Sequence, residues 1–141
     1  MNENRIFPII RILSTAGVIL AVYLLWQQIA HPDFQPCNIS SLINCKAVIS
    51  GPLARTFGIP TPLYGLIGYF VIFVSSIYRK KILLLSMASF GLIFCLWIAY
   101  RELFQLHVIC PICITCQLIM ITIFVLAIKV NKKRLLKSTI Q

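Results

Sequence analysis

Two of the six cysteines stand in the motif Cys110-Pro111-Ile112-Cys113, whose chemistry is thiol–disulfide exchange. A spacing of three residues on a helix puts both sulfurs on one face, close enough to form a disulfide. If a helix begins here, its free amide hydrogens and the positive end of its dipole favour the thiolate, the attacking form of cysteine. Pro111 suits the first turn, where its missing N–H costs no hydrogen bond. By itself the motif also fits a metal site or two packed cysteines.

A second pair, Cys37 and Cys45, strengthens the redox interpretation. A relay of electrons through thiols needs two pairs that can exchange with each other. The two remaining cysteines have plainer interpretations, because a cysteine in an apolar stretch usually packs as a small hydrophobic residue. We expect this of Cys95. Cys116 shares the helix face of Cys113 and could contact a cofactor or react, but packing is the simpler interpretation.

The composition places these cysteines in a membrane protein. Hydrophobic residues make up 60% of the 141 positions and charged residues 11%, whereas a soluble domain has about 25% charged residues. Mean hydropathy is +0.93. The net charge of +10 does not indicate nucleic-acid binding, because the basic residues lie between apolar runs rather than on a face with polar and aromatic groups. The length leaves room for one domain, over residues 1–141.

Four apolar stretches can position the cysteines, since a helix needs roughly 20 residues to cross a bilayer. They run over about 6–29, 62–78, 82–100 and 108–130. The first is longer than the apolar core of a signal peptide, so we expect it to be retained as a helix. The predicted fold class is an all-α membrane protein, a four-transmembrane-helix bundle with a long outer loop at 30–61.

The positive charges predict the orientation of the bundle, because lysine and arginine gather on the cytoplasmic side. Ten of the 13 lie at the two termini or in the connection between the second and third helices. The ten are Arg5, Arg11, Arg79, Lys80, Lys81, Lys129, Lys132, Lys133, Arg134 and Lys137. Both termini are therefore expected in the cytoplasm, and both cysteine pairs on the outer side. We expect the basic cluster at 132–134 and Lys137 to bind anionic membrane lipid.

The outer loop is expected to hold short helices over 38–48 and 52–57, because Pro52 suits a first helical turn. Its apolar segment at 53–59 should lie on the membrane surface. Arg101 and Glu102 follow at the outer end of the third helix, where a weak local ion pair is expected and a role in protonating a reduced cofactor is the alternative. His107 is interpreted as an interfacial residue, although it could also move a proton.

Electrons that reach the last cysteine pair need an acceptor. The sequence has no haem, flavin or nucleotide motif and no histidine-rich metal cluster. Cys113 lies a turn inside the apolar zone, where a lipid-soluble quinone could reach it. Gln117 shares that face one turn deeper, and it could donate to a quinone carbonyl or simply bond to a neighbouring helix.

Five segments carry a further resemblance. They are Cys37-Asn38-Ile39-Ser40-Ser41-Leu42-Ile43-Asn44-Cys45, Val48-Ile49-Ser50, Phe57-Gly58-Ile59-Pro60, Leu63-Tyr64-Gly65-Leu66 and Cys110-Pro111-Ile112-Cys113-Ile114-Thr115. In this order they resemble the vitamin K epoxide reductase family, in its bacterial form, from the first helix to the end of the fourth. The quinone-reducing partner of bacterial disulfide oxidases has similar chemistry, but it carries its CxxC in the first outer loop.

The resemblance implies a role for each cysteine of the two pairs. Cys37 and Cys45 would take electrons from a separate, extracytoplasmic thioredoxin-like dithiol protein, Cys110 would exchange with them, and Cys113 would face a quinone, either ubiquinone or menaquinone. Such a relay supports disulfide formation in exported proteins. The resemblance also implies that the protein lies in a bacterial plasma membrane, which the absence of a C-terminal retrieval signal favours. The residues expected to contact the quinone are Cys113, Gln117, Thr61 and Tyr64, and no metal is expected.

Three positions depart from the animal members of the family. Gln117 replaces a tyrosine, Thr61 an asparagine, and Gly51 the second serine of a pair. These differences argue against epoxide reduction, which stays an alternative. The other alternative is a non-enzymatic membrane scaffold or metal-handling channel whose outer disulfides are static.

Overall fold

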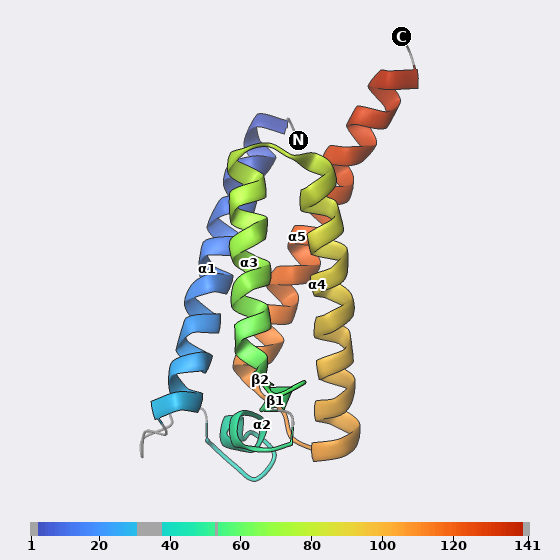
Figure 1. Cartoon of the computed structure of the whole chain (residues 1–141). Coiled ribbons are helices and arrows are strands. Elements are labelled where there is room, and N and C mark those ends of the chain that lie inside the picture. The colour runs from blue at the N-terminus through green and yellow to red at the C-terminus, as the bar shows by residue number, and fades with distance from the viewer. Residues whose placement is uncertain (1–2, 31–37, 53, 140–141) are drawn as a thin grey trace.

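A computed structural model describes residues 3–30, 38–52 and 54–139. For residues 133–139 it describes the backbone alone. Within these ranges four long helices lie side by side (Figure 1). They are α1 (Glu3–Ala30), α3 (Thr61–Ile77), α4 (Lys81–Arg101) and α5 (Pro111–Thr139). Both ends of the chain lie at one end of the bundle, and the short elements of the loop lie at the other.

Three of the described helices are long and apolar enough to cross a membrane, over Asn4–Ala30, Lys81–Leu106 and Pro111–Lys132. The prediction of an all-α membrane protein is confirmed to this extent. The second predicted helix is the short one, since α3 has 17 residues. It packs against α1 and α4, while α5 packs against α4 and α1. The fourth crossing stays a prediction.

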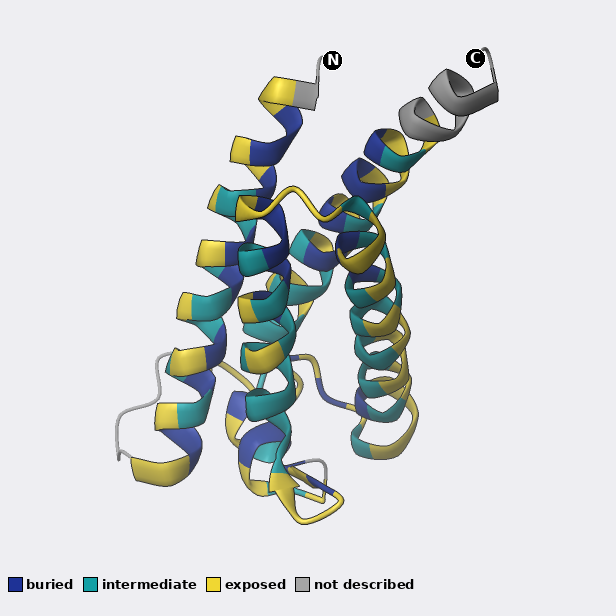
Figure 2. Ribbon diagram, turned by 45° about the horizontal axis from the view of Figure 1, so that its top comes forward, coloured by how far each residue is buried: buried dark blue, intermediate teal, exposed yellow. Residues whose placement is uncertain are grey.

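Exposed residues lie along the outer faces of the helices (Figure 2). Many of them are large apolar residues, so apolar side chains lie outside the bundle as well as inside it. On α4, for example, Phe90 and Ile93 are 65% and 67% exposed, while Leu84 and Ala88 are fully buried. A helix that is apolar all round belongs inside a protein core or a bilayer. Because these outer faces meet no other part of the described chain, hydrocarbon is the solvent that suits them.

Two glycines let neighbouring helices approach closely. A Cβ on Gly17 of α1 would stand 2.5 Å from the ring of Tyr69 on α3. A Cβ on Gly91 of α4 would stand 2.8 Å from the terminal methyl of Met120 on α5. In lipid the hydrophobic effect does not drive helices together. Small residues at such crossings allow close van der Waals packing, which stabilises the helix pair instead. Polar contacts add to this at the end with the termini, where Asn131 donates to the Lys81 carbonyl at 3.1 Å.

The first part of the loop forms one short helix, α2 (Cys45–Ser50), which begins later than predicted. Asn44 is its N-cap and accepts the Ala47 N–H at 3.1 Å through its side chain. The expected start at 38 is wrong because the chain turns there, with the N–H groups of Ile39 and Ser40 both donating to the Ile43 carbonyl. The helix therefore starts at Cys45 itself.

The second predicted loop helix, over 52–57, does not form. In its place β1 (Arg55–Thr56) pairs antiparallel with β2 (Ile59–Pro60). Phe57 and Gly58 make the turn with φ values of 54° and 83°, and positive φ at both central residues is the geometry that matches the twist of a tight hairpin. Pro52 fits a helix start, but Gly58 favours the hairpin. The Phe57 side chain is 95% exposed at its tip.

The third helix runs into a wider turn before the CxxC motif. Helix α4 continues as a π-helix, η1 (Glu102–Leu106), which ends at His107 with a φ of 52°. The fourth helix then begins at Pro111 instead of 108 and continues to Thr139, beyond the predicted end at 130. Ile109 pairs with Ile43 in an isolated parallel bridge, and its N–H donates to the Leu42 carbonyl at 2.7 Å. This bridge joins the loop to the segment before Cys110.

Candidate functional site

Cys110 occupies the N-cap position of α5. Its carbonyl accepts the Ile114 N–H at 3.0 Å, which is the first hydrogen bond of the helix. Its sulfur accepts the Cys113 N–H at 3.4 Å, as the side-chain oxygen of an N-cap residue would. Pro111 is the first helical residue. The expected placement of the CxxC motif at the start of the fourth helix is thus what the chain adopts.

The sulfurs of Cys110 and Cys45 lie 3.4 Å apart, and both side chains are fully buried. Cys45 is disulfide-bonded, whereas Cys110 and Cys113 are free thiols. A separation of about 3–3.5 Å between reacting atoms is typical of a geometry from which reaction can start. Cys37, the other predicted member of the loop pair, lies outside the described residues.

The surroundings of Cys110 favour its thiolate. The Cys113 thiol donates a hydrogen bond to it, and the backbone N–H groups of Cys113 and Ile112 add to this, so the pKa of Cys110 is lowered despite its burial and the nearby Glu102 carboxyl. The two backbone N–H groups are free amides of a helix start, and such amides stabilise negative charge. Of the two cysteines in the motif, Cys110 is therefore built to attack a disulfide.

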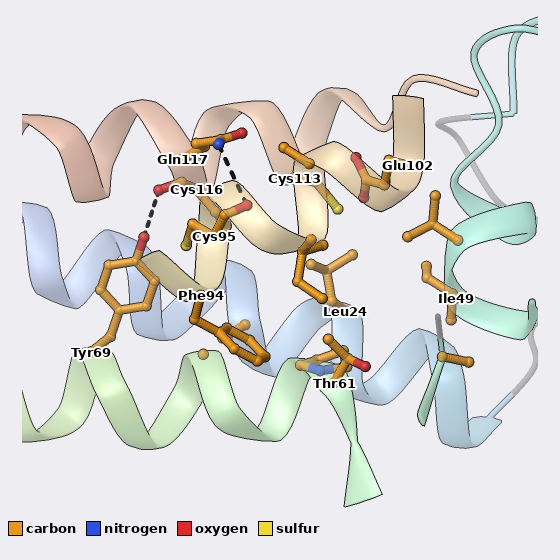
Figure 3. A pocket seen from close by; sticks show the side chains of 17 residues that line it. Leu24, Ile49, Thr61, Tyr69, Phe94, Cys95, Glu102, Cys113, Cys116 and Gln117 are labelled. Atoms are coloured by element: carbon orange, nitrogen blue, oxygen red, sulfur yellow. Dashed lines mark hydrogen bonds between the residues drawn. The ribbon is translucent and has the colours of Figure 1, made fainter. Parts of the chain in front are cut away.

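An apolar cavity of about 110 Å³ begins beside Cys113 (Figure 3). All four long helices and α2 line it; the labelled lining residues are Leu24, Ile49, Thr61, Tyr69, Phe94, Cys95, Glu102, Cys113, Cys116 and Gln117. A cavity of roughly 150 Å³ accommodates a benzene ring. This one is close to the size of a single ring, with a thiol at one side.

The predicted quinone contacts are only partly in this cavity. Cys113, Gln117 and Thr61 line it, but Tyr64 does not. The hydroxyl of Tyr64 donates to the Thr56 carbonyl at 3.2 Å, and its ring packs on Phe94. Tyr64 thus supports the cavity wall from behind.

The polar side chains of the wall bond mostly to other helices. Gln117 Nε2 donates to the Cys95 carbonyl at 3.4 Å, which is the helix-to-helix alternative expected for it. The Tyr69 hydroxyl donates to the Cys116 carbonyl at 2.6 Å (Figure 3). Sequence reasoning missed Tyr69, since a tyrosine in mid-span carries no motif. Cys95 and Cys116, expected to pack as hydrophobic residues, both reach the cavity wall.

Glu102 is the second lining residue whose place the sequence did not predict. Its side chain is 5% exposed, its carboxyl faces the Cys113 thiol (Figure 3), and its Oε1 has no hydrogen-bond partner among the described residues. The expected ion pair with Arg101 is not formed, because the Arg101 Nε donates to Gln105 at 2.7 Å and its guanidinium lies over the Trp97 ring. One signal could have found it: of three acidic residues in the chain, Glu102 alone ends a membrane-length apolar run.

Other predicted features lie away from the cavity. His107 is exposed and ends η1. Among the residues that the structure describes, no group of three or more His, Cys, Asp or Glu side chains could hold a metal ion.

Comparison with known proteins agrees with this arrangement. No curated protein sequence matches the chain significantly. The model of the vitamin K epoxide reductase family, however, matches residues 8–128, which include all six cysteines and every lining residue of the cavity. Over that length the match shows that the chain belongs to the vitamin K epoxide reductase family and is a membrane oxidoreductase.

Proposed function

We propose that the chain re-oxidises a thioredoxin-like dithiol protein outside the membrane and passes the two electrons to a quinone. The observation that carries this proposal is the 3.4 Å contact between a disulfide-bonded Cys45 and a free Cys110. Static outer disulfides, as in a scaffold, would not need one pair reduced and the other oxidised with their sulfurs in contact.

The first half of the reaction is a chain of thiol–disulfide exchanges. A partner thiolate attacks the proposed Cys37–Cys45 disulfide, and the partner's second thiol completes its own disulfide, which leaves Cys37 and Cys45 reduced. The Cys45 thiolate then attacks Cys110 in the Cys110–Cys113 disulfide and releases Cys113. Cys37 attacks Cys45 in turn, so that Cys110 leaves as a thiolate. The products are an oxidised loop pair and a reduced CxxC pair, the redox state that the free Cys110 and Cys113 and the bonded Cys45 represent.

The second half returns the CxxC pair to its disulfide. Cys110 and Cys113 give up two electrons and two protons, and a quinone takes up both to become a quinol. Cys113 is the cysteine of the motif that lines the cavity, so its sulfur meets the quinone ring. We assign Thr61 and Gln117, which line the same cavity, to the binding of the ring, and Tyr64 to its support through Phe94.

The proposed placement in the membrane follows the positive charges. Both termini and the 79–81 connection lie at one end of the bundle (Figure 1). The starts of α2 and α5, where Cys45 and the CxxC motif stand, lie at the end with the hairpin. We place the first end in the cytoplasm of a bacterium and the second outside, and we take residues 1–141 as one domain with four crossings. An oxidised partner would then install disulfides in exported proteins.

Substitution of Cys113 by serine tests the proposal. Wild-type protein in lipid nanodiscs is supplied with a reduced thioredoxin-like donor and with decyl-ubiquinone or menadione, and quinol formation is followed together with thiol trapping. We expect quinol formation to stop in Cys113→Ser, while Cys45 still exchanges with the donor. If Cys110 and Cys113 of the wild type stay oxidised when donor is supplied without quinone, the relay is wrong. Quinone production from a supplied quinone epoxide would instead support the epoxide-reducing alternative.

A further inference from the structure

We infer that Glu102 is a proton-transfer residue of the quinone-reducing step, accepting the proton of the Cys113 thiol and delivering it to a quinone oxygen. The inference rests on the proposed function, because it names the group that moves a proton at the same cavity.

The position of Glu102 at the start of η1, directly after α4, directs its carboxyl into the cavity. Five residues of this segment line the cavity wall: Phe94, Cys95, Ile98, Ala99 and Glu102. Positions 95, 98, 99 and 102 have the spacing i, i+3, i+4 and i+7, which is one face of a helix. The preceding residue, Arg101, therefore points to another side. The π-helix that starts at Glu102 widens the backbone at this point, and such wide turns occur often at functional sites.

One carboxyl oxygen of Glu102 has no hydrogen-bond partner among the described residues that would explain its burial. Its side chain is 5% exposed, and Oε1 bonds to no described group. Arg101, the adjacent cation, bonds to Gln105 and lies over Trp97 instead. An acidic side chain at the end of an apolar span is costly to keep, so its retention there points to a task.

The titratable groups that face Glu102 are those of the reaction. From α5 the Cys113 thiol faces its carboxyl (Figure 3), and Cys110 is close enough to interact with the same charge. The titratable residues of α2 are Cys45, which is disulfide-bonded, and Lys46, whose side chain is exposed. Glu102 thus faces the cysteine of the CxxC motif that lines the cavity, and both groups border the space in which a quinone ring would lie.

The protons and electrons of the step balance with Glu102 as a carrier. The Glu102 carboxylate takes the proton of Cys113, whose thiolate bonds to the quinone ring. The Glu102 carboxylic acid gives this proton to one quinone oxygen and becomes a carboxylate again. Cys110 then loses its proton to the second quinone oxygen, and its thiolate attacks the Cys113 sulfur. The bond between Cys113 and the ring breaks, the disulfide forms, and the ring leaves as the quinol. Glu102 is unchanged at the end, and two S–H protons have become two O–H protons.

The experiment compares four variants of the whole chain in nanodiscs. Each is reduced, freed of reductant and mixed with decyl-ubiquinone, and quinone absorbance is followed in a stopped-flow instrument. Glu102→Gln removes the proton carrier at nearly constant shape. Gln105→Glu adds a carboxyl to the exposed side of the same π-helix, and the double variant combines both and so keeps the net charge. Glu102→Asp keeps the carboxyl but shortens the side chain by one methylene, which moves the carboxyl away from the Cys113 thiol.

The expected results separate a proton carrier from a structural residue. General acid–base groups contribute about 100-fold or more to a rate, so Glu102→Gln and the double variant should form quinol about 100-fold more slowly. Gln105→Glu should match the wild type, and Glu102→Asp should lie between. Reduction of the Cys110–Cys113 disulfide by a thioredoxin-like donor should be unchanged in all four, because that exchange does not use Glu102.

Two results would overturn the inference. One is quinol formation at the wild-type rate in Glu102→Gln. The other is an equal slowing of donor-driven disulfide reduction and quinol formation, which would show that Glu102 only holds the structure. Should Glu102→Gln fail to accumulate, Glu102→Asp decides by the same comparison of the two rates. Different results would contradict the proposed function. These are a wild-type protein that forms no quinol, or a Cys113→Ser variant that still forms it.

Discussion

The sulfur of Cys110 contacts the sulfur of Cys45 at 3.4 Å, although the two residues are 65 positions apart in the chain. Each is at the start of a helix, Cys45 in α2 and Cys110 before α5. The bridge between Ile43 and Ile109, two positions before the first cysteine and one before the second, holds these starts together. The bridge thereby ties the loop to the segment that carries the second redox pair.

Cys45→Ser should abolish electron transfer from the protein donor, because Cys45 is the loop sulfur in contact with Cys110. Donor-driven quinol formation should fall to background. A small dithiol that reaches Cys110 directly should still drive the reaction in part. Lys46→Ala is the matched control, since its side chain is exposed and its rate should equal the wild type. Undiminished donor-driven activity in Cys45→Ser would contradict the assigned contact.

The pKa of Cys110 should lie below the value of about 8.5 that is usual for a free cysteine, because the Cys113 thiol and the backbone amides donate to its sulfur. The thiolate then persists as pH falls below that value, and exchange with the Cys45 disulfide slows only as pH drops through the lowered pKa of Cys110. Thiolate absorbance as a function of pH measures it, in a protein whose other free cysteines are replaced.

Two variants of Cys113 test the cause of this shift. Cys113→Ala removes the largest contribution, the side-chain hydrogen bond, so the pKa of Cys110 should rise. Cys113→Ser keeps a donor of similar size and should raise it less. Equal pKa values in the two variants would show that the backbone amides alone set the acidity of Cys110.

Gly17→Ala should destabilise the bundle by about 1–3 kcal/mol, the usual cost of overpacking a dense interior. The added methyl would stand 2.5 Å from the Tyr69 ring, which cannot retreat easily because its hydroxyl bonds to the Cys116 carbonyl. Thermal unfolding in mild detergent measures the effect. Gly68→Ala is the control, since a Cβ there would meet nothing within 4 Å. A similar midpoint for both variants would refute a tight crossing of α1 and α3.

Ile109→Pro should slow the exchange between the two cysteine pairs without affecting the cavity. It removes the N–H that donates to the Leu42 carbonyl at 2.7 Å. A net hydrogen bond is worth roughly 1 kcal/mol, so the population with the sulfurs in contact should fall about fivefold. Ile109→Val keeps the N–H and should behave as wild type. Trapping of the Cys45–Cys110 mixed disulfide in a background that lacks the resolving cysteines measures the difference.

The helices and the redox motif were predictable because their causes are local. Apolar runs long enough to span are visible in the composition of each segment, and Pro111 marks a helix start whatever surrounds it. The ends of the helices were less predictable. Helix α5 continues beyond the predicted end at residue 130, because the basic segment that follows is rich in good helix formers although it is not apolar.

The loop and the cavity could not be predicted in the same way, because distant contacts decide them. Pro52 favoured a helix where the chain makes a hairpin, since only pairing of Thr56 with Ile59 reveals that Phe57 and Gly58 adopt positive φ. Glu102 looked like a partner of Arg101 because the two are adjacent, but adjacent residues of a helix point to different sides. Tyr69 reaches the cavity only because Gly17 lets α1 pass so close to its ring.

The hydrogen bond from the Cys113 N–H to the Cys110 sulfur gives the end of α5 two chemical forms. In the dithiol form, with Cys110 ionised, the first turn is capped by a full negative charge, which a helix start holds firmly. In the disulfide form the same sulfur is neutral and covalently tied to the donor residue itself. The amide proton of Cys113 therefore experiences a charged acceptor in one half of each cycle and a neutral one in the other, so its chemical shift and exchange rate are a built-in record of the oxidation state of the protein.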